Sequence, residues 1–192
     1  MRRVVVTGLG LLSSIGENLD KTWSSLINCK SGIKNIVSFD TSDLPCKIGG
    51  FISHNENDEF FLDRLKFLEQ KEINRNDRFI QYGLIASKMA IEDAGLDLLS
   101  EENKLNIGVS IGSGIGGLET IYDGSKTLLE KNPRKISPFF IPSSLINLLS
   151  GQVSIKNGFK GPNHSVVTAC ATGAHSIGDA SEIIKRGAAQ IM

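Results

Sequence analysis

Apolar residues recur every three or four positions in several stretches of this chain, and that spacing is typical of amphipathic helices. The first such stretch follows Asn18, whose side chain is well suited to cap a helix, and it ends near Ser31 and Gly32. Its apolar residues share one face, and we expect that face to be buried: Leu19, Trp23, Leu26 and Ile27.

The longest helix is predicted between residues 76 and 95. Asn76 or Asp77 is suited to cap its start, and Gly95 is suited to end it in left-handed backbone. Apolar and small residues at helical spacing define the stripe that we expect to be buried: Phe79, Ile80, Gly83, Leu84, Ser87, Ala90, Ile91 and Ala94.

Three further helices follow the same reasoning. One begins near Leu118, after a glycine-rich loop. Another has Pro142 in its first turn, where a missing N–H costs nothing, and ends at Gly158. The last begins at Ala171 and ends at Gly187, just after two basic residues that suit the negative end of a helix dipole.

Short runs of β-branched and apolar residues between these helices predict strands. They cover residues 3–7, 106–112 and 165–169; another strand begins at residue 188, and residues 47–52 are expected to form an edge strand. Alternating strands and helices are typical of a mostly parallel sheet covered by helices. The sequence therefore indicates the α/β class.

The composition is that of an ordinary soluble globular protein. Of the 192 residues, 40% are hydrophobic and 22% are charged. Lysine plus arginine and aspartate plus glutamate each number 21, so no net field attracts the chain to nucleic acid or to an acidic membrane. No apolar run approaches the roughly 20 residues of a transmembrane helix. We therefore expect neither nucleic acid nor a membrane among its partners.

The chain has three cysteines, Cys29, Cys46 and Cys170, which are widely separated. An odd number at such spacing matches neither a disulfide framework nor a metal-binding motif, so we expect no metal. Free thiols fit a reducing compartment, and the sequence therefore predicts a cytoplasmic protein.

Cys170 stands where a predicted strand meets a predicted helix. Residues 165–169 form the β-branched run, and Ala171 opens a stretch of small residues compatible with a helix. The free N–H groups and the positive dipole end of a helix N-terminus favour a thiolate and can hold an oxyanion. Cys170 is therefore a candidate nucleophile, and the alternative is an inert cysteine that fills space in the core.

Two glycine-rich turns fail to match nucleotide-binding motifs. Gly8 and Gly10 follow the first predicted strand, but Ser13 stands where a dinucleotide fingerprint has its third glycine. Residues 112–117 lack the Gly-Lys-Ser/Thr of a phosphate-binding loop. We therefore expect no nucleotide cofactor, and no other cofactor is indicated.

Four stretches, in order along the chain, resemble the β-ketoacyl-[acyl carrier protein] synthases. The most specific is Val166 to Ala180, Val-Val-Thr-Ala-Cys-Ala-Thr-Gly-Ala-His-Ser-Ile-Gly-Asp-Ala, which resembles the nucleophile segment of that family. The others are Arg2 to Gly10, Ile111 to Gly117 and Pro133 to Pro142. Within the family, the chain is most similar to the elongating type II enzymes of fatty acid synthesis.

This resemblance implies a thiolase-like fold, of which residues 1–192 form the amino-terminal half and end within a strand. It implies a 3-oxoacyl-[acyl carrier protein] synthase, in which a cysteine takes an acyl group and malonyl-carrier protein then condenses with it by decarboxylation. The carboxy-terminal half lies outside this sequence. We therefore expect this chain alone to lack the condensation step. Either a longer native chain or a second chain would supply the missing half.

The resemblance also implies roles for particular residues. Cys170 would be the nucleophile, Ile115 would line the acyl pocket, and Phe140 and Ile141 would reach the acyl pocket of the neighbouring subunit in a homodimer. From the residues alone, simple packing is an equal alternative for Ile115. Basic residues near the start of the long helix would face the acidic carrier protein, or else form a solvated surface: Lys66, Lys71, Arg75 and Arg78.

None of the three histidines matches a catalytic histidine of the family. His175 lies about 140° around the predicted helix from Cys170, because each residue advances about 100°. His164 precedes the cysteine on the predicted strand, and His54 lies in an irregular stretch. We expect all three to be surface or packing residues, and the family's histidine pair to belong to the missing half.

Two other classes of function stay open. A thiolase-type enzyme on the same fold would take its acyl group from coenzyme A rather than from a carrier protein. A non-catalytic remnant would bind only acyl groups or partners.

Overall fold

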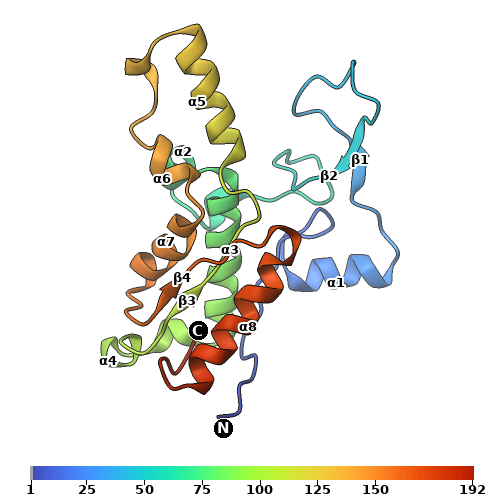
Figure 1. The fold of residues 1–192 in the computed structure, drawn as a ribbon. Helices are drawn as coiled ribbons and strands as arrows, with labels where there is room; N and C mark the ends of the chain where they lie inside the picture. Colours follow the sequence, from blue (N-terminus) through green and yellow to red (C-terminus); the bar gives the residue numbers. More distant parts are fainter. Residues whose placement is uncertain (1) are drawn as a thin grey trace.

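The computed structural model describes residues 2–192. In the view of Figure 1, the long helix α3 (Arg78–Asp93) runs through the middle of the body, between α7 (Asn147–Asn157) and α8 (Thr172–Lys185). Helix α5 (Leu118–Glu130) projects from one end of the body, and a smaller lobe lies to one side. The core therefore forms around α3.

Helix α3 begins and ends as predicted. Asp77 caps it, since its Oδ1 accepts the N–H of Phe79 at 3.2 Å, and Gly95 follows it in left-handed backbone with φ of 66°. Its inner face is completely buried at Ile80 and Ile85. The side chains around them form the core: Leu62, Leu68, Leu84, Ile91, Ile107, Val109, Leu149, Val153 and Phe159.

The helix predicted from Pro142 to Gly158 is divided in two. Helix α6 (Phe140–Ser144) stops because Leu145 has extended backbone, and α7 then begins two residues later. Within α6 the Ser144 hydroxyl donates to the carbonyl of the first residue at 2.6 Å, a local bond of the kind that competes with helix continuation. The predicted end is confirmed, since Gly158 has φ of 71°.

The parallel sheet is small in the described residues. Strand β3 (Val109–Ser110) pairs with β4 (Asn163–His164) in parallel, and a parallel bridge joins Ile107 to Ile191 on the other side. The strands predicted at residues 106–112 and from residue 188 are thus confirmed over part of their length. The strand predicted at residues 165–169 is wrong, because the chain there leaves the sheet and turns toward α8.

The strand predicted at residues 3–7 is also absent. The segment passes beside α3, and two glycines bring it onto the helix backbone: a Cβ on Gly8 would lie 2.8 Å from the Ala94 Cβ, and one on Gly10 would lie 2.8 Å from the Ala90 nitrogen. The N–H of Leu9 donates to Asp93 Oδ2 at 2.8 Å. Residues 8–10 therefore pack on α3, and residues 3–7 form no strand ladder within the described residues.

The side lobe holds α1 (Leu19–Ile27), which starts as predicted because Asn18 Oδ1 accepts the N–H of Lys21 at 2.9 Å. It ends at Ile27, before the predicted Ser31 and Gly32. The prediction that its apolar face is buried is wrong, since Trp23 is 64% exposed. The buried side of the helix is the polar one, where the Thr22 hydroxyl lies 2.9 Å from that of Ser13.

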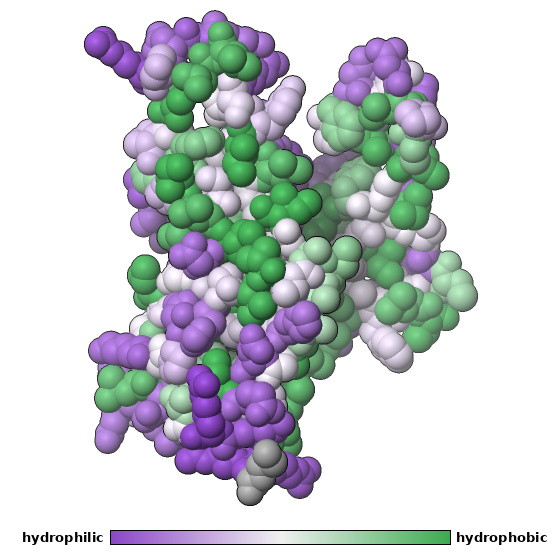
Figure 2. All heavy atoms as spheres, viewed as in Figure 1, coloured by the Kyte–Doolittle hydropathy of each residue, from purple (hydrophilic) through white to green (hydrophobic). Residues whose placement is uncertain are grey.

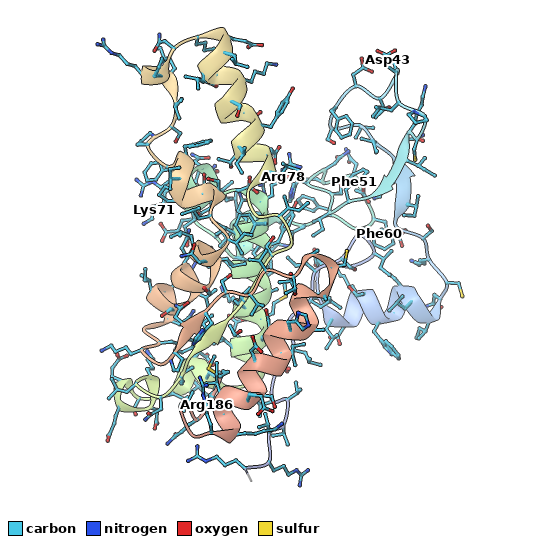
Figure 3. The ribbon with its side chains drawn as sticks, viewed as in Figure 1. Asp43, Phe51, Phe60, Lys71, Arg78 and Arg186 are labelled. Atoms are coloured by element: carbon cyan, nitrogen blue, oxygen red, sulfur yellow. The ribbon has the colours of Figure 1, made fainter. Side chains whose placement is uncertain are left out.

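An antiparallel pair of strands completes the lobe. Strand β1 (Ile33–Asn35) pairs with β2 (Ile48–Gly50), so the edge strand predicted at residues 47–52 is confirmed. Lys34 in β1 forms an ion pair with Asp58, and its ammonium lies over the rings of Phe51 and Phe60, which Figure 3 labels. The remaining short elements are α2 (Gln70–Arg75), α4 (Glu101–Lys104) and four 3₁₀ turns at Arg64–Lys66, Leu96–Leu98, Pro133–Lys135 and Ala169–Ala171.

The described chain exposes more surface than a compact monomer of its size. Its accessible area is 12056 Å², whereas a folded monomer of 20.8 kDa is expected to expose about 8,900 Å². Figure 2 shows hydrophobic residues along the centre of one face, over α5 and the elements below it. Among residues 2–192 no helix has the length and apolar character needed to cross a membrane.

Candidate functional site

Cys170 lies in the 3₁₀ turn Ala169–Ala171, which leads directly into the 14-residue helix α8. The cysteine is exposed, and within residues 2–192 its backbone N–H donates no hydrogen bond. The positive end of the α8 dipole therefore lies beside the thiol. The predicted junction with a helix is confirmed, and the alternative of a buried, space-filling cysteine is wrong.

The turn before Cys170 is held by one threonine side chain. Thr172 Oγ1 accepts the N–H of Thr168 at 2.9 Å and donates to the carbonyl of Ala169 at 2.8 Å. Between them Ala169 has φ of 51°, in the left-handed region that side chains rarely adopt. His175, one turn into α8, supports the same turn through its Nδ1, which lies 2.6 Å from Thr168 Oγ1.

The glycine-rich loop at residues 112–117 packs against this turn. A Cβ on Gly114 would lie 3.2 Å from the Ala169 carbonyl oxygen, and Gly112 is pressed against the Val166 carbonyl and the Thr172 methyl group. Larger residues would push the loop away from the turn. Two of the four stretches identified in the sequence, far apart in the chain, are therefore neighbours in space.

The other side of the loop touches the end of α6. The N–H of Gly117 donates to the Ser144 carbonyl at 3.1 Å. Gly116 has φ of 81°, and a Cβ there would lie 2.7 Å from Ile146 Cγ1. Residues just after the stretch Pro133 to Pro142 thus support the glycine-rich loop, and this loop in turn supports the Cys170 turn.

The predicted acyl-pocket residues are spread over two elements. Ile115 lies on the loop beside Gly114 and is 67% exposed. Phe140 is partly buried, with its ring against Gly124 of α5, and Ile141 is exposed on α6. Only Ile115 shares an element with a residue that packs on the Cys170 turn, so the role of all three stays a prediction.

Three of the four basic residues predicted to face a carrier protein already have partners in the chain. Lys66 closes the turn Arg64–Lys66 and is exposed. The contacts of the others are these: Lys71 pairs with Glu69 at 2.7 Å, Arg78 with Glu119 at 2.9 Å, and the Arg75 guanidinium lies 4.7 Å from the Phe139 ring centre. Figure 3 shows Lys71 on the outside of the body and Arg78 near the base of α5.

The histidines occupy surface or packing positions, as predicted. His164 and His175 are exposed. His54 is partly buried: its Nδ1 lies 3.2 Å from the Leu62 carbonyl and so carries the proton, and its Nε2 accepts from the Tyr82 hydroxyl at 3.0 Å. Burial lowers the pKa of His54 and raises that of Tyr82, which favours the neutral forms of both.

The two other cysteines are also exposed, Cys29 and Cys46. In the described part of the chain, no group of three or more histidine, cysteine or acidic side chains is arranged to hold a metal ion. Around Cys170 the site is built from the thiol, backbone groups, threonine hydroxyls and the His175 imidazole.

One supporting residue gave no functional signal in the sequence. Asp77, which caps α3, also accepts hydrogen bonds through Oδ2 from the N–H of Thr120 at 2.9 Å and from its hydroxyl at 2.8 Å. It thereby ties the start of α3 to the start of α5, directly after the glycine-rich loop. Such a link spans two distant stretches, and local patterns along a chain do not report it.

Comparison with known proteins assigns the family. The model of the β-ketoacyl synthase N-terminal domain matches residues 1–192. The chain therefore belongs to the β-ketoacyl synthase family. The resemblance given by the four stretches is confirmed over the whole chain.

Curated members of the β-ketoacyl synthase family are similar over the whole of this sequence. A 3-oxoacyl-[acyl-carrier-protein] synthase 2 from Rhizobium meliloti (strain 1021) is 47% identical over 192 residues, which are 100% of this chain and 46% of that protein. The enzyme of the same name from Vibrio cholerae is 45% identical over 191 residues and 44% of its own length. The chain spans about half the length of the curated relatives it matches.

Solved β-ketoacyl synthase relatives confirm the α/β, thiolase-like fold. The ishigamide ketosynthase/chain length factor superposes with a TM-score of 0.78 at 26% identity, over 98% of this chain and 45% of that one. A ketosynthase in complex with its type II PKS acyl-carrier protein superposes with a TM-score of 0.68 at 22% identity, over 96% and 47% of the two chains. The small parallel sheet described above is thus part of that fold.

Proposed function

We propose that this chain belongs to a 3-oxoacyl-[acyl carrier protein] synthase of fatty acid biosynthesis and that Cys170 is its acyl-accepting nucleophile. The observation that carries the proposal is the exposed thiol of Cys170 at the start of α8, beside its own free N–H. Family membership over residues 1–192 and the names of the relatives support it.

Acyl transfer to Cys170 would proceed by substitution at a thioester. The thiolate Sγ attacks the acyl carbonyl carbon and forms a new C–S bond. The carbonyl becomes an oxyanion, which the N–H of Cys170 and the N-terminus of α8 would stabilise. When the intermediate collapses, the carrier thiolate leaves and takes up the proton that Cys170 has released.

Condensation would need groups beyond this site. Malonyl-carrier protein must lose CO₂, and the resulting enolate must be stabilised before its carbon attacks the acyl-cysteine. We propose that a histidine pair on polypeptide outside residues 1–192 does this. Of the histidines in this chain, His54 bonds to the Leu62 carbonyl, His175 bonds to Thr168, and His164 is exposed on β4. We therefore expect the 192-residue chain to be acylated without forming a 3-oxoacyl product.

The proposed substrate carrier is acyl carrier protein bearing acyl and malonyl thioesters. One structural neighbour is a ketosynthase in complex with its acyl-carrier protein, which supports this class of partner. Lys66 is the proposed basic residue with the fewest contacts, whereas Lys71, Arg75 and Arg78 would have to exchange theirs. We propose a cytoplasmic homodimer in which Ile115 lines the acyl pocket and Phe140 and Ile141 reach the pocket of the other subunit.

Intact-mass measurement after incubation with acyl-[acyl carrier protein] tests the proposal. We expect one acyl group on the wild-type chain, located at Cys170 by peptide mapping, and none on Cys170→Ser. Cys29 and Cys46 are internal controls because both are exposed thiols. Equal labelling of all three cysteines would show that Cys170 has no special reactivity, and the chain would then be a non-catalytic remnant.

Two further readouts complete the test. Acyl-coenzyme A replaces the carrier thioester in a parallel reaction, and faster acylation from coenzyme A would favour a thiolase-type enzyme. Malonyl-[acyl carrier protein] is then added to the acylated chain. Formation of a 3-oxoacyl product by this chain alone would disprove the expectation that the condensation groups lie elsewhere.

A further inference from the structure

Thr172, the first residue of α8, has a side chain that contacts two parts of the site. The residue is 4% exposed, so water does not compete for the bonds of its hydroxyl. Its Oγ1 accepts the N–H of Thr168 at 2.9 Å and donates to the carbonyl of Ala169 at 2.8 Å. Its methyl group lies against Gly112 of the glycine-rich loop, where an added Cβ would clash with it. Both branches of the side chain therefore have a neighbour.

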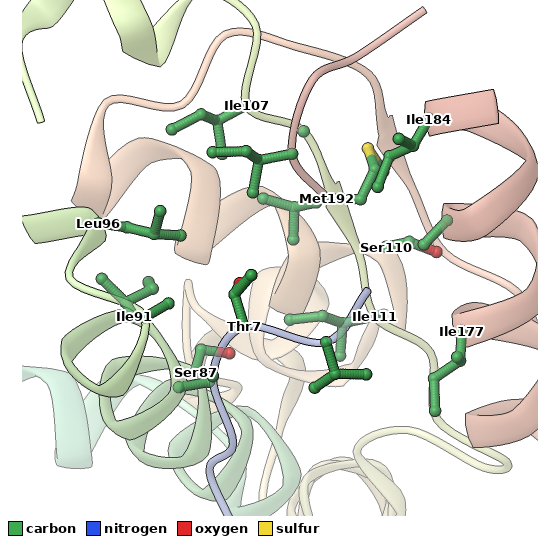
Figure 4. A pocket seen from close by; sticks show the side chains of 18 of the residues that line it. Thr7, Ser87, Ile91, Leu96, Ile107, Ser110, Ile111, Ile177, Ile184 and Met192 are labelled. Atoms are coloured by element: carbon green, nitrogen blue, oxygen red, sulfur yellow. The ribbon is translucent and has the colours of Figure 1, made fainter. Parts of the chain in front are cut away.

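The loop surface that meets the methyl group is held without help from Thr172. Ile111, directly before Gly112, donates its N–H to β4, and its carbonyl accepts the Ser165 hydroxyl at 2.8 Å. Its side chain lines an apolar cavity that Ile177 of α8 also lines (Figure 4). Because a β-branched side chain has few rotamers, a methyl group kept against this loop keeps the hydroxyl toward the turn.

The two bonds of the Thr172 hydroxyl lie on either side of a strained residue. The N–H of Thr168 precedes Ala169, and the bonded carbonyl is that of Ala169 itself, whose φ of 51° is in the left-handed region. Such backbone persists only where neighbouring groups hold it. The backbone N–H of Thr172 also donates to the Ala169 carbonyl, as any residue there could, but the bond to Thr168 needs the hydroxyl.

The carbonyl of Ala169 determines the direction of the Cys170 N–H. The two groups belong to one planar peptide unit, in which the C=O and the N–H point in opposite directions. Since the carbonyl is directed toward Thr172, the N–H is directed away from it, and this N–H donates no hydrogen bond within residues 2–192. If the peptide turned over, a carbonyl oxygen would take the place of the N–H and would repel an oxyanion.

We infer that Thr172 is a positioning residue for acyl transfer, and that its hydroxyl keeps the Cys170 N–H available to the oxyanion formed at the acyl carbonyl. The inference rests on the proposed function of Cys170 and adds a second side chain to it. Thr172 acts through the peptide between Ala169 and Cys170 and forms no bond to the substrate.

His175 supports the turn in a different way. Its Nδ1 bonds to the hydroxyl of Thr168, so this bond joins two side chains and does not involve the peptide between Ala169 and Cys170. Loss of that bond would leave both bonds of the Thr172 hydroxyl in place. The orientation of the Cys170 N–H is therefore assigned to Thr172.

Two variants separate the hydroxyl from the rest of the side chain. Thr172→Val keeps the shape and removes the hydroxyl, whereas Thr172→Ser keeps the hydroxyl. Single-turnover acylation from octanoyl-[acyl carrier protein] is followed by intact mass. We expect Thr172→Val to lower the rate constant at saturating substrate at least about tenfold, because an oxyanion donor is no longer held in place. The concentration that gives half the maximal rate should change little, and Thr172→Ser should stay within about threefold of the wild-type rate.

Alkylation by iodoacetamide shows whether the variant acts on the oxyanion. In that reaction the Cys170 thiolate attacks the carbon that bears iodine, a C–S bond forms and iodide leaves, so no oxyanion develops. We therefore expect Thr172→Val to change the rate of alkylation less than about threefold. Equal slowing of alkylation and acylation would disprove the positioning role, because the variant would then have changed the thiol or the fold.

The matched control is Thr22→Val in the side lobe. Thr22 is also 4% exposed, and its hydroxyl lies 2.9 Å from that of Ser13 in the same lobe. This variant should leave the acylation of Cys170 unchanged. Circular dichroism checks the folding of each protein, and Thr172→Ala, which adds no bulk to the turn, replaces Thr172→Val if that variant does not fold.

The outcomes separate this inference from the proposed function. If the wild-type chain is acylated at Cys170 and Thr172→Val is acylated as fast, the positioning role is overturned and the proposed nucleophile stands. A wild-type chain without an acyl group on Cys170 would overturn both. Equal slowing by Thr22→Val and Thr172→Val would also overturn the positioning role, because loss of any buried threonine hydroxyl would then have the same effect.

Discussion

Helices α1 and α3 begin in the same way and have different surroundings. Each starts at a side chain that accepts a backbone N–H, Asn18 for α1 and Asp77 for α3, and each carries apolar residues at helical spacing. The apolar face of α3 is buried, with Ile85 completely inaccessible, whereas that of α1 is exposed at Trp23.

This difference between α1 and α3 shows that helix formation is decided locally and that burial of a helix face is not. Capping and spacing decide that both segments are helical, because the groups involved lie within a few residues. Burial requires a partner surface, and α3 finds one in α7 and the sheet. Helix α1 turns its polar side inward and leaves its apolar face without a partner in the described chain.

The largest effect is expected from the core of α3. Ile85→Ala should lower the free energy of unfolding by about 2–5 kcal/mol, because it removes buried apolar contacts and leaves a cavity. Urea unfolding followed by circular dichroism measures this. Ile85→Val, which removes one methyl group, should cost about 1 kcal/mol. A loss below that for Ile85→Ala would mean that α3 is not the centre of the core.

A matched pair of cap variants sharpens the comparison. Asp77→Ala should destabilise the protein by about 2 kcal/mol, since it removes the cap of α3 and leaves the N–H of Thr120 without its acceptor. Asn18→Ala removes only a cap and should cost about 1 kcal/mol. Equal losses in urea unfolding would show that the link from Asp77 to α5 contributes nothing.

The pH dependence of stability probes the packing against α3. Burial lowers the pKa of His54, so below about pH 6.5 the unfolded chain takes up a proton before the folded one does. Stability should therefore fall as the pH drops below that value. Urea unfolding between pH 7 and pH 5 should show a smaller fall for His54→Gln than for the wild type.

The matching control is His164→Gln, at an exposed position of β4. If its pH dependence changes as much as that of His54→Gln, the burial of His54 is not the cause.

The smallest effect is expected at the exposed face of α1. Trp23→Ala should change the free energy of unfolding by no more than about 0.5 kcal/mol, because the side chain is 64% exposed. Trp23 is the only tryptophan in the sequence, so unfolding of this variant must be followed by tyrosine fluorescence or circular dichroism. A loss above 2 kcal/mol would show that α1 is covered in solution, and the contrast with α3 would then disappear.

Sequence patterns predicted the helices of this fold better than its strands. Caps at Asn18 and Asp77 and terminators at Gly95 and Gly158 act over a few residues, so the pattern contains what is needed. The run at residues 3–7 has the composition of a strand, but pairing depends on a strand from elsewhere in the chain, and the glycines that follow the run pack on α3 instead.

The candidate site was predicted in part. The position of Cys170 at the start of a helix follows from the residues on either side of it, and the structure has that arrangement. The support from Thr172, the left-handed Ala169 and the packing of Gly114 were not predicted, because they depend on contacts between distant stretches or on backbone angles that composition does not report.

The left-handed backbone of Ala169 fixes the geometry of the Cys170 turn at a cost in the stability of the fold. An alanine at φ of 51° is held in a conformation that costs about 1–2 kcal/mol, and its backbone angles set the orientation of the next N–H, that of Cys170, which donates no hydrogen bond within residues 2–192. Glycine at this position would remove the strain and with it the preference for that single orientation. Selection for a more heat-resistant protein would thus tend to loosen the backbone N–H on which the proposed acyl transfer to Cys170 depends.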